Sequence, residues 1–158
     1  MVSYVAVLLF GLLSLAPFPS SAFTLQKLDA ACNCKSTIEV LQSLVQNLNK
    51  LVADVVSKEE DIESCGKEEA VDFYKAAIFV LERDLAAINN QPLPHPFPYY
   101  PSCLFTSSIY GSLDGIARNL YNAAEIANSC PCPIPQAAGQ EVSKAVDTLK
   151  SLLKKVQG

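Results

Sequence analysis

Apolar residues recur at every third or fourth position in four separate stretches of this chain. Such spacing places the apolar side chains on one face of an α-helix, which completes a turn every 3.6 residues. Each stretch has at least four apolar positions on its face, enough for a helix that packs against a common core. The pattern predicts four main helices, at residues 36–52, 67–88, 108–129 and 140–156.

The first and second predicted helices carry distinct local signals. Ser36 and Glu39 match a capping box, in which a serine hydroxyl and a glutamate carboxylate satisfy backbone N–H groups at a helix start. Residues 51–56 are rich in β-branched side chains and fit either the last turn of the first helix or a short strand. Additional apolar residues flank the core face of the second helix, so we expect it to be the most buried of the four.

A proline-rich link, residues 89–103, separates the second and third helices. Alternating prolines forbid helix and favour an extended path, because proline fixes its own backbone angle and donates no hydrogen bond. We interpret the link as a stiff connection tied down at Cys103. A docking site for a proline-recognising domain is less favoured, because such domains are mainly intracellular. The five prolines are Pro92, Pro94, Pro96, Pro98 and Pro101.

These elements, without a convincing sheet, predict an all-α fold in which four helices form a bundle. The sequence alone leaves the topology of that bundle open. The link after the third helix, about eight residues, spans at most roughly 26–29 Å when extended. That reach is short for a crossover along the full length of a bundle.

Residues 1–22 are typical of a secretory signal peptide. Residues 5–15 form an apolar core, two prolines end it, and Ser20, Ser21 and Ala22 supply small residues for cleavage. The apolar run is shorter than the ~20 residues that a membrane-spanning helix needs. We therefore expect a secreted, extracellular protein without membrane insertion, whose mature domain comprises residues 23–158.

The cysteines predict disulfide bonds. An even number of cysteines in a small secreted domain favours a disulfide framework, and six cysteines allow 15 pairings. A zinc site or a redox centre built from the two Cys-x-Cys pairs is less favoured, because the spacing is unusual for zinc and secretion favours oxidised cysteine. The six are Cys32, Cys34, Cys65, Cys103, Cys130 and Cys132.

Composition excludes several classes of function. The net charge is −4 and no basic cluster precedes the last helix, which argues against nucleic-acid binding. His95 is the only histidine and lies between prolines, so no nucleophile–histidine pair with a supporting context can be built. The carboxylates of residues 59–61, Glu68 and Glu69 are interpreted as solvated charge. We expect no enzymatic activity, no cofactor and no metal.

The run from Arg118 to Pro133, RNLYNAAEIANSCPCP, resembles the third helix and its exit in the interleukin-4/interleukin-13 family. In that family an Arg-Asn-Leu, a following aromatic residue and an Asn-Ser-Cys-Pro close the helix. The spacing between Arg118 and Cys130 differs from the family pattern by one residue. The specific part covers about a tenth of the chain, and elsewhere the resemblance lies in helix order and cysteine placement.

This resemblance implies a short-chain four-helix bundle cytokine with up-up-down-down topology. It implies a secreted, monomeric protein that bridges two cell-surface cytokine receptor chains and drives type 2 immune signalling, including B-cell activation. By position, Glu39 matches the receptor-binding glutamate on the family's first helix, and Arg118 matches the receptor-binding arginine on its third. Each residue also has a purely local interpretation, Glu39 as the capping-box residue and Arg118 as an ordinary exposed arginine.

The resemblance also implies a disulfide pairing. The family joins the start of the second helix to the end of the third, which corresponds here to Cys65–Cys130. Cys32 and Cys34 would then pair separately with Cys103 and Cys132, in an order left open. If the second helix extended back unbroken, Cys65 would face solvent, and Gly66 offers the change of direction that turns it inward.

A second function remains open from the sequence, a secreted, disulfide-bonded helical carrier of a small apolar ligand. The strongly apolar second helix and the aromatic residues around the proline-rich link support this alternative. A carrier requires an internal cavity of roughly 300 Å³ or more, whereas a cytokine bundle is close-packed.

Overall fold

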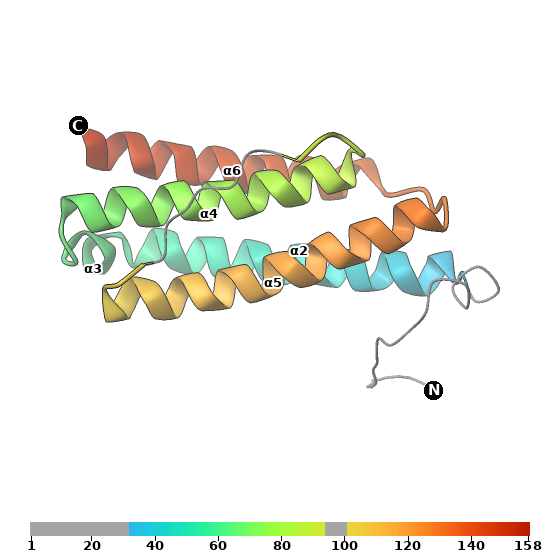
Figure 1. Ribbon diagram of the computed structural model, residues 1–158, viewed down its shortest axis with the longest axis horizontal. Helices are drawn as coiled ribbons and strands as arrows, with labels where there is room; N and C mark the ends of the chain where they lie inside the picture. The colour runs from blue at the N-terminus through green and yellow to red at the C-terminus, as the bar shows by residue number, and fades with distance from the viewer. Residues whose placement is uncertain (1–31, 94–100) are drawn as a thin grey trace. The chain divides into compact units, whose positions relative to one another are not determined.

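The computed structural model describes residues 32–93 and 101–158, and all regular secondary structure in these residues is helical. The helices lie in one unit, Cys34–Gly158 (Figure 1). The predicted signal peptide, residues 1–22, and His95 lie outside the described residues. The helices are α2 (Cys34–Ser57), α3 (Glu59–Glu63), α4 (Lys67–Ile88), α5 (Leu104–Ser129) and α6 (Gln136–Gln157).

The all-α prediction is confirmed, and each of the four predicted helices is present. The second predicted helix matches α4 at both ends. Residues 51–56 belong to α2 rather than to a strand, because Val52 and Val55 continue the buried stripe of Leu41, Val45 and Leu48. The short helix α3 was not predicted; only Ile62 among its five residues is buried, too little for a periodic pattern.

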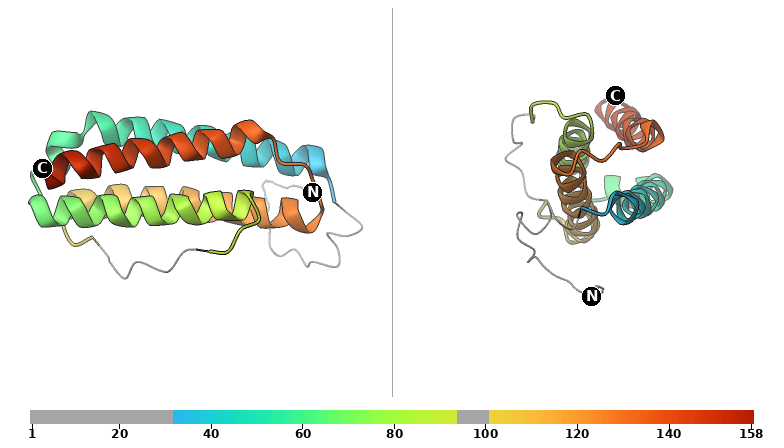
Figure 2. Two further views of the ribbon diagram at one scale, coloured as in Figure 1. Left: turned by 90° about the horizontal axis from the view of Figure 1, so that it is seen from above. Right: turned by 90° about the vertical axis from the view of Figure 1, so that its right-hand side faces the viewer.

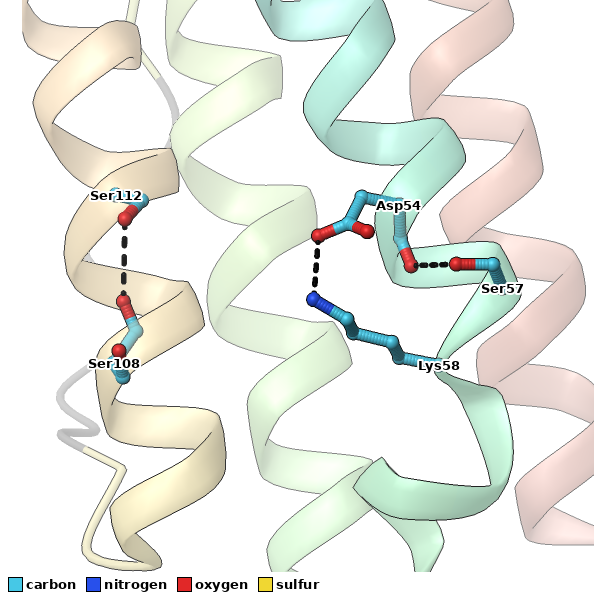
Figure 3. A network of polar contacts seen from close by, with 5 residues as sticks. All are labelled: Asp54, Ser57, Lys58, Ser108 and Ser112. Atoms are coloured by element: carbon cyan, nitrogen blue, oxygen red, sulfur yellow. Dashed lines mark hydrogen bonds and ion pairs between the residues drawn. The ribbon is translucent and has the colours of Figure 1, made fainter.

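Helix α2 begins and ends at polar or covalent contacts. It begins at Cys34, which is bonded to Cys132, so Ser36 lies inside the helix and the capping-box interpretation of its start is wrong. At the other end the Ser57 hydroxyl donates to the Asp54 carbonyl oxygen (2.7 Å), and Lys58 Nζ lies 2.9 Å from the Asp54 carboxylate (Figure 3). These contacts close the last turn, after which the chain reverses through α3.

Helix α5 begins four residues earlier than predicted because Glu69 of α4 caps it. The backbone N–H groups of Ser102 and Cys103 donate to Glu69 Oε2 over 3.0 Å and 3.2 Å, and the Thr106 hydroxyl donates to the same oxygen over 3.1 Å. The first N–H groups of a helix lack partners within it, and a carboxylate there also complements the helix dipole. The interpretation of Glu69 as solvated charge is therefore wrong.

Replacing Glu69 with alanine is expected to lower the free energy of unfolding by about 1–2 kcal/mol, the usual effect of losing a capping side chain. Urea unfolding followed by circular dichroism measures this change. The exposed neighbour Glu68 provides the matched control, because Glu68→Ala should change stability by less than about 0.5 kcal/mol. Equal effects of the two substitutions would contradict the capping role.

The four long helices run in two directions. Figures 1 and 2 show α2 and α6 running one way and α4 and α5 running the other. Two contacts agree: Lys155, near the end of α6, pairs with Glu59 just beyond α2 at 2.9 Å, and Asn128 near the end of α5 donates to the Ala87 carbonyl near the end of α4. The neighbouring pairs are α4 with α6, α4 with α5, α2 with α5, and α2 with α6.

The expected up-up-down-down topology is wrong, because consecutive helices α2 and α4 are antiparallel and α4 and α5 are parallel. At 1.5 Å per residue, α2 is about 36 Å long. Residues 58–66, five of them in α3, are too few to return along that length, whereas a link of fifteen residues such as 89–103 can span at most roughly 50 Å. The one link long enough for a crossover lies between the second and third long helices.

One hydrophobic core receives a buried stripe from each long helix. Helix α4 supplies the largest share, which confirms the expectation that it is the most buried. Asp84 lies among its buried side chains and is 0 % exposed. The buried residues of α4 are Ala70, Phe73, Tyr74, Ala76, Ala77, Ile78, Val80, Leu81, Asp84, Ala87 and Ile88.

The expected Cys65–Cys130 disulfide is wrong, because Cys65 bonds Cys103 with a Cα–Cα distance of 5.9 Å. Parallel α4 and α5 place the residues before their starts side by side, while Cys130 lies at the opposite end of α5. Cys103 is thus not available to the N-terminal cysteines.

The Cys34–Cys132 disulfide, with a Cα–Cα distance of 5.3 Å, is one of the pairings that the sequence left open. It joins the start of α2 to the exit of the antiparallel helix α5. Cys32 and Cys130 are disulfide-bonded as well, and no described cysteine is free. A fully oxidised set of cysteines fits an oxidising compartment.

Candidate functional site

The chain contains two arginines, and both lie on the face formed by α4 and α5. Arg83 comes from α4 and Arg118 from α5. Asp114, one turn before Arg118, is paired with both, and Tyr121 follows on the same helix. We call Arg83, Asp114, Arg118 and Tyr121 the arginine site. It exists because α4 and α5 are parallel neighbours.

The two arginines are held differently. Arg118 Nε donates to Asp114 Oδ2 over 2.8 Å, whereas Arg83 Nη2 lies 4.0 Å from Asp114 Oδ1, beyond hydrogen-bond distance. The Arg83 guanidinium carbon also lies 5.6 Å from the centre of the Tyr121 ring, a cation–π geometry. The side chain of Arg83 is 19 % exposed and that of Arg118 is 67 % exposed. Arg83 is thus mostly buried and held in place, whereas Arg118 is exposed to solvent.

A surface depression of about 380 Å³ opens at this site. A second depression, of about 450 Å³, adjoins it through Tyr121 and Leu93, and Leu93 is 52 % exposed. The site therefore combines cationic, aromatic and aliphatic surface. The described residues that line the first depression are Arg83, Leu93, Arg118, Tyr121 and Asn122.

The charge of the site is set partly by burial. Burial raises the pKa of Asp84, the neighbour of Arg83, to about 8; the Arg83 charge opposes this shift and the Asp114 charge adds to it. Burial, and then a hydrogen bond with Glu125, raise the pKa of Tyr121. Near pH 7 both groups are mainly neutral, so the four residues of the arginine site carry two guanidinium charges and the Asp114 carboxylate, with Glu125 beside them, bonded to Tyr121.

The structure places the two residues predicted to bind a receptor in different surroundings. Arg118 lies in the arginine site, and Glu39 is exposed on α2. The structure brings Arg118 together with Arg83, while Glu39 lines none of the described depressions. Sequence analysis missed Arg83 because its relation to Arg118 depends on the parallel packing of α4 and α5. The signal available in the sequence was that Arg83 and Arg118 are the only two arginines of the chain.

A second surface is lined by residues of α2 and α6, the pair of helices that Figure 2 shows opposite the pair α4 and α5. It is a groove of about 510 Å³ lined by both apolar and polar side chains. Asn49 Nδ2 of α2 donates to Glu141 Oε1 of α6 over 2.7 Å, and Val56 is 40 % exposed. The lining residues are Asn49, Val52, Ala53, Val56, Glu141, Lys144, Ala145 and Thr148.

The described residues, 32–93 and 101–158, show neither a metal-binding cluster nor a membrane span. No cluster of three or more histidine, cysteine, aspartate or glutamate side chains there is placed to hold a metal ion. None of the helices in this part of the chain is both long and apolar enough to cross a membrane. The two surfaces offer a partner charged and apolar contacts.

No protein-family model matches the chain, and no curated protein or solved structure matches it either. The resemblance to the interleukin-4/interleukin-13 family thus depends on the run from Arg118 to Pro133 and on the looser similarity of helix order and cysteine placement.

Proposed function

We propose that this protein is a secreted, monomeric four-helix bundle cytokine that bridges two cell-surface receptor chains. The observation that supports this most is the presence of two surfaces on different sides of one small helical unit: the arginine site on α4 and α5, and the groove on α2 and α6. A ligand that holds two receptor chains at once needs two such surfaces. The disulfide bonds fit secretion, because they persist in oxidising compartments.

The kind of signalling is proposed from the sequence resemblance. The residues that resemble the interleukin-4/interleukin-13 family begin at Arg118, inside the arginine site, and the resemblance implies type 2 immune signalling and B-cell activation. The observed topology differs from the up-up-down-down order of that family. The proposal therefore assigns the receptor-binding role of the family's arginine to Arg118, which lies beside Arg83 of α4.

The alternative, a carrier of a small apolar ligand, has less support. A carrier encloses its ligand and buries most of the ligand surface. The described depressions of about 310–510 Å³ instead lie between helices at the surface, where each is lined partly by exposed side chains. This arrangement favours the recognition of another protein.

Receptor contact at the arginine site predicts that Arg118→Ala weakens cell binding by about 2 kcal/mol or more, roughly thirtyfold, if the residue is a hot spot. The sequence resemblance predicts the same for Glu39→Ala on α2, which lies outside the two surfaces. Val56→Glu, which places a charge at the groove on α2 and α6, should also weaken binding. Labelled protein is titrated onto B cells by flow cytometry, with unlabelled protein as competitor. Bridging predicts that variants altered on one surface still occupy cells but fail to trigger tyrosine phosphorylation inside them.

Matched controls are Lys75→Ala for the arginine and Glu68→Ala for the glutamate, both exposed and outside the two surfaces. Circular dichroism verifies that every variant is folded. Saturable binding that none of the surface variants changes would contradict the proposed receptor surfaces. Uptake of an apolar dye in place of cell binding would favour the carrier.

A further inference from the structure

We propose that the arginine site is a socket for an acidic side chain of the partner protein, and that Arg83 is the residue that grips the carboxylate. This inference rests on the proposed function, in that it names the chemistry of the partner at one of the two surfaces. It assigns to α4 a binding residue that the sequence resemblance does not supply.

Arg83 carries hydrogen-bond donors without an acceptor. Its Nε and Nη2 atoms are buried and have no hydrogen-bond partner, although the Asp114 carboxylate lies nearby at 4.0 Å from Nη2. Buried polar groups in proteins are almost always hydrogen-bonded, so an unsatisfied pair calls for a physical reason. A carboxylate has two oxygens spaced to accept from a guanidinium in parallel, and such paired contacts are among the strongest hydrogen bonds in proteins.

The guanidinium of Arg83 is held in place before a partner arrives, but its Nε and Nη2 atoms are shielded from solvent, so a carboxylate reaches them only after a neighbouring side chain moves aside. The Tyr121 ring lies beneath it at 5.6 Å, and little of the side chain is exposed. Much of the loss of side-chain freedom and of hydration has therefore occurred in the free protein, and a fixed binding group loses less on association. Arg118, largely exposed and bonded to Asp114 through Nε, stands at the mouth of the depression and attracts a negative charge towards it.

The local charges favour a singly charged group. The four residues of the arginine site carry a net charge of +1, and Glu125, bonded to Tyr121, lies beside them. A phosphate or sulfate carrying two charges would meet Asp114 at close range, whereas a carboxylate carries one charge and has the geometry of the guanidinium fork. Leu93 and Tyr121 line the same depression, so the acidic side chain is expected to be flanked by an apolar one. The partner segment therefore contains an aspartate or glutamate beside an aliphatic or aromatic residue.

The test uses the purified, disulfide-bonded protein without any receptor. With two arginines in the chain, the arginine Nε–H region of a ¹⁵N-correlated NMR spectrum contains two signals, and Arg118→Lys identifies the one from Arg83. The probes are the capped peptides acetyl-Leu-Glu-Leu-amide and acetyl-Leu-Gln-Leu-amide, which differ only in the charge of the central side chain. We expect the Arg83 signal to move saturably with the glutamate peptide, and the glutamine peptide to bind at least tenfold more weakly.

Sodium chloride at matched ionic strength is the control for screening, and Arg83→Lys is the control for geometry, because lysine keeps the charge but not the planar fork. Loss of saturable binding in Arg83→Lys supports the socket. Equal binding of the two peptides, or a response confined to Arg118, overturns it. If Arg83→Lys fails to fold, the response of the Arg83 NMR signal in the unsubstituted protein to the two peptides still tests the socket. Peptide binding without cell binding would reject the cytokine and keep the socket, and the reverse result would reject the socket alone.

Discussion

Replacing Asp84 with asparagine is expected to stabilise the protein at pH 8 and to change its stability little at pH 4. Asp84 is 0 % exposed on the core face of α4, and neither carboxylate oxygen has a hydrogen-bond partner. The core residues contributed by α2 and α6 are apolar, so the charges that act on Asp84 are those of Arg83 and Asp114. Burial disfavours the charged form and raises the pKa of Asp84 to about 8.

The direction of the effect follows from proton binding. In the unfolded chain Asp84 loses its proton near pH 3.8, and in the folded protein it keeps the proton to about pH 8. Between these values the folded state binds one more proton, so the free energy of unfolding falls as pH rises and levels off above pH 8. At 1.36 kcal/mol per pKa unit the decrease is on the order of 5 kcal/mol. Asparagine does not titrate and removes this decrease.

Urea unfolding of the wild type and of Asp84→Asn from pH 4 to pH 9 measures the difference, which should widen steadily with pH. Asp147→Asn, on the exposed surface of α6, is the control for ordinary surface carboxylates and should show no such trend. Parallel pH curves for the wild type and Asp84→Asn would contradict a neutral, buried Asp84. Asp84→Leu should stabilise the protein at neutral pH as well, if leucine fits the same space in the core.

Removing the Cys65–Cys103 disulfide, by replacing both cysteines with alanine, is expected to lower the free energy of unfolding by about 4 kcal/mol. The chain-entropy relation supports this value for a loop of this length, because the cross-link removes disorder from the unfolded chain. The bond also holds the start of α5 against α4, beside the cap that Glu69 provides. Denaturant unfolding of the double variant measures the loss.

The cap and the disulfide share Cys103, so their effects are expected to be coupled. A cycle that combines the double cysteine variant with Glu69→Ala separates the two contributions. Additive losses would mean that the cap persists without the cross-link, and a smaller combined loss would mean that the cross-link positions the cap. A loss below about 1 kcal/mol for the double cysteine variant would contradict the loop-entropy argument.

The helices were predictable because amphipathic periodicity is a local property of the chain. Helix α4 matches its prediction at both ends, and residues 51–56 follow the apolar stripe of α2 despite their β-branched side chains. The early start of α5 was not predictable from its own residues, because Glu69, which caps it, belongs to another helix. The sequence predicts a helix end that is set by the spacing of the helix's own apolar residues. It does not predict a helix end that is set by a side chain from another helix.

The arginine site was only half predictable. Arg118 was singled out by the sequence resemblance, and its role in binding stays a prediction. Arg83 was missed because its place beside Asp114 requires α4 and α5 to be parallel. Asp84 was missed for a related reason: an aspartate in an apolar stretch is known to be buried only when the neighbouring helices enclose it.

The sequence by itself determined that this protein is helical, where its four long helices lie and which of them is most buried. Only the tertiary structure decided the direction of each helix, the partner of Cys65 and the meeting of the two arginines. The physical reason is that a periodic stripe marks which face of a helix is buried but carries no information on its direction. Direction depends on the reach of the links, and residues 58–66 and 89–103 differ in reach enough to reverse the expected topology.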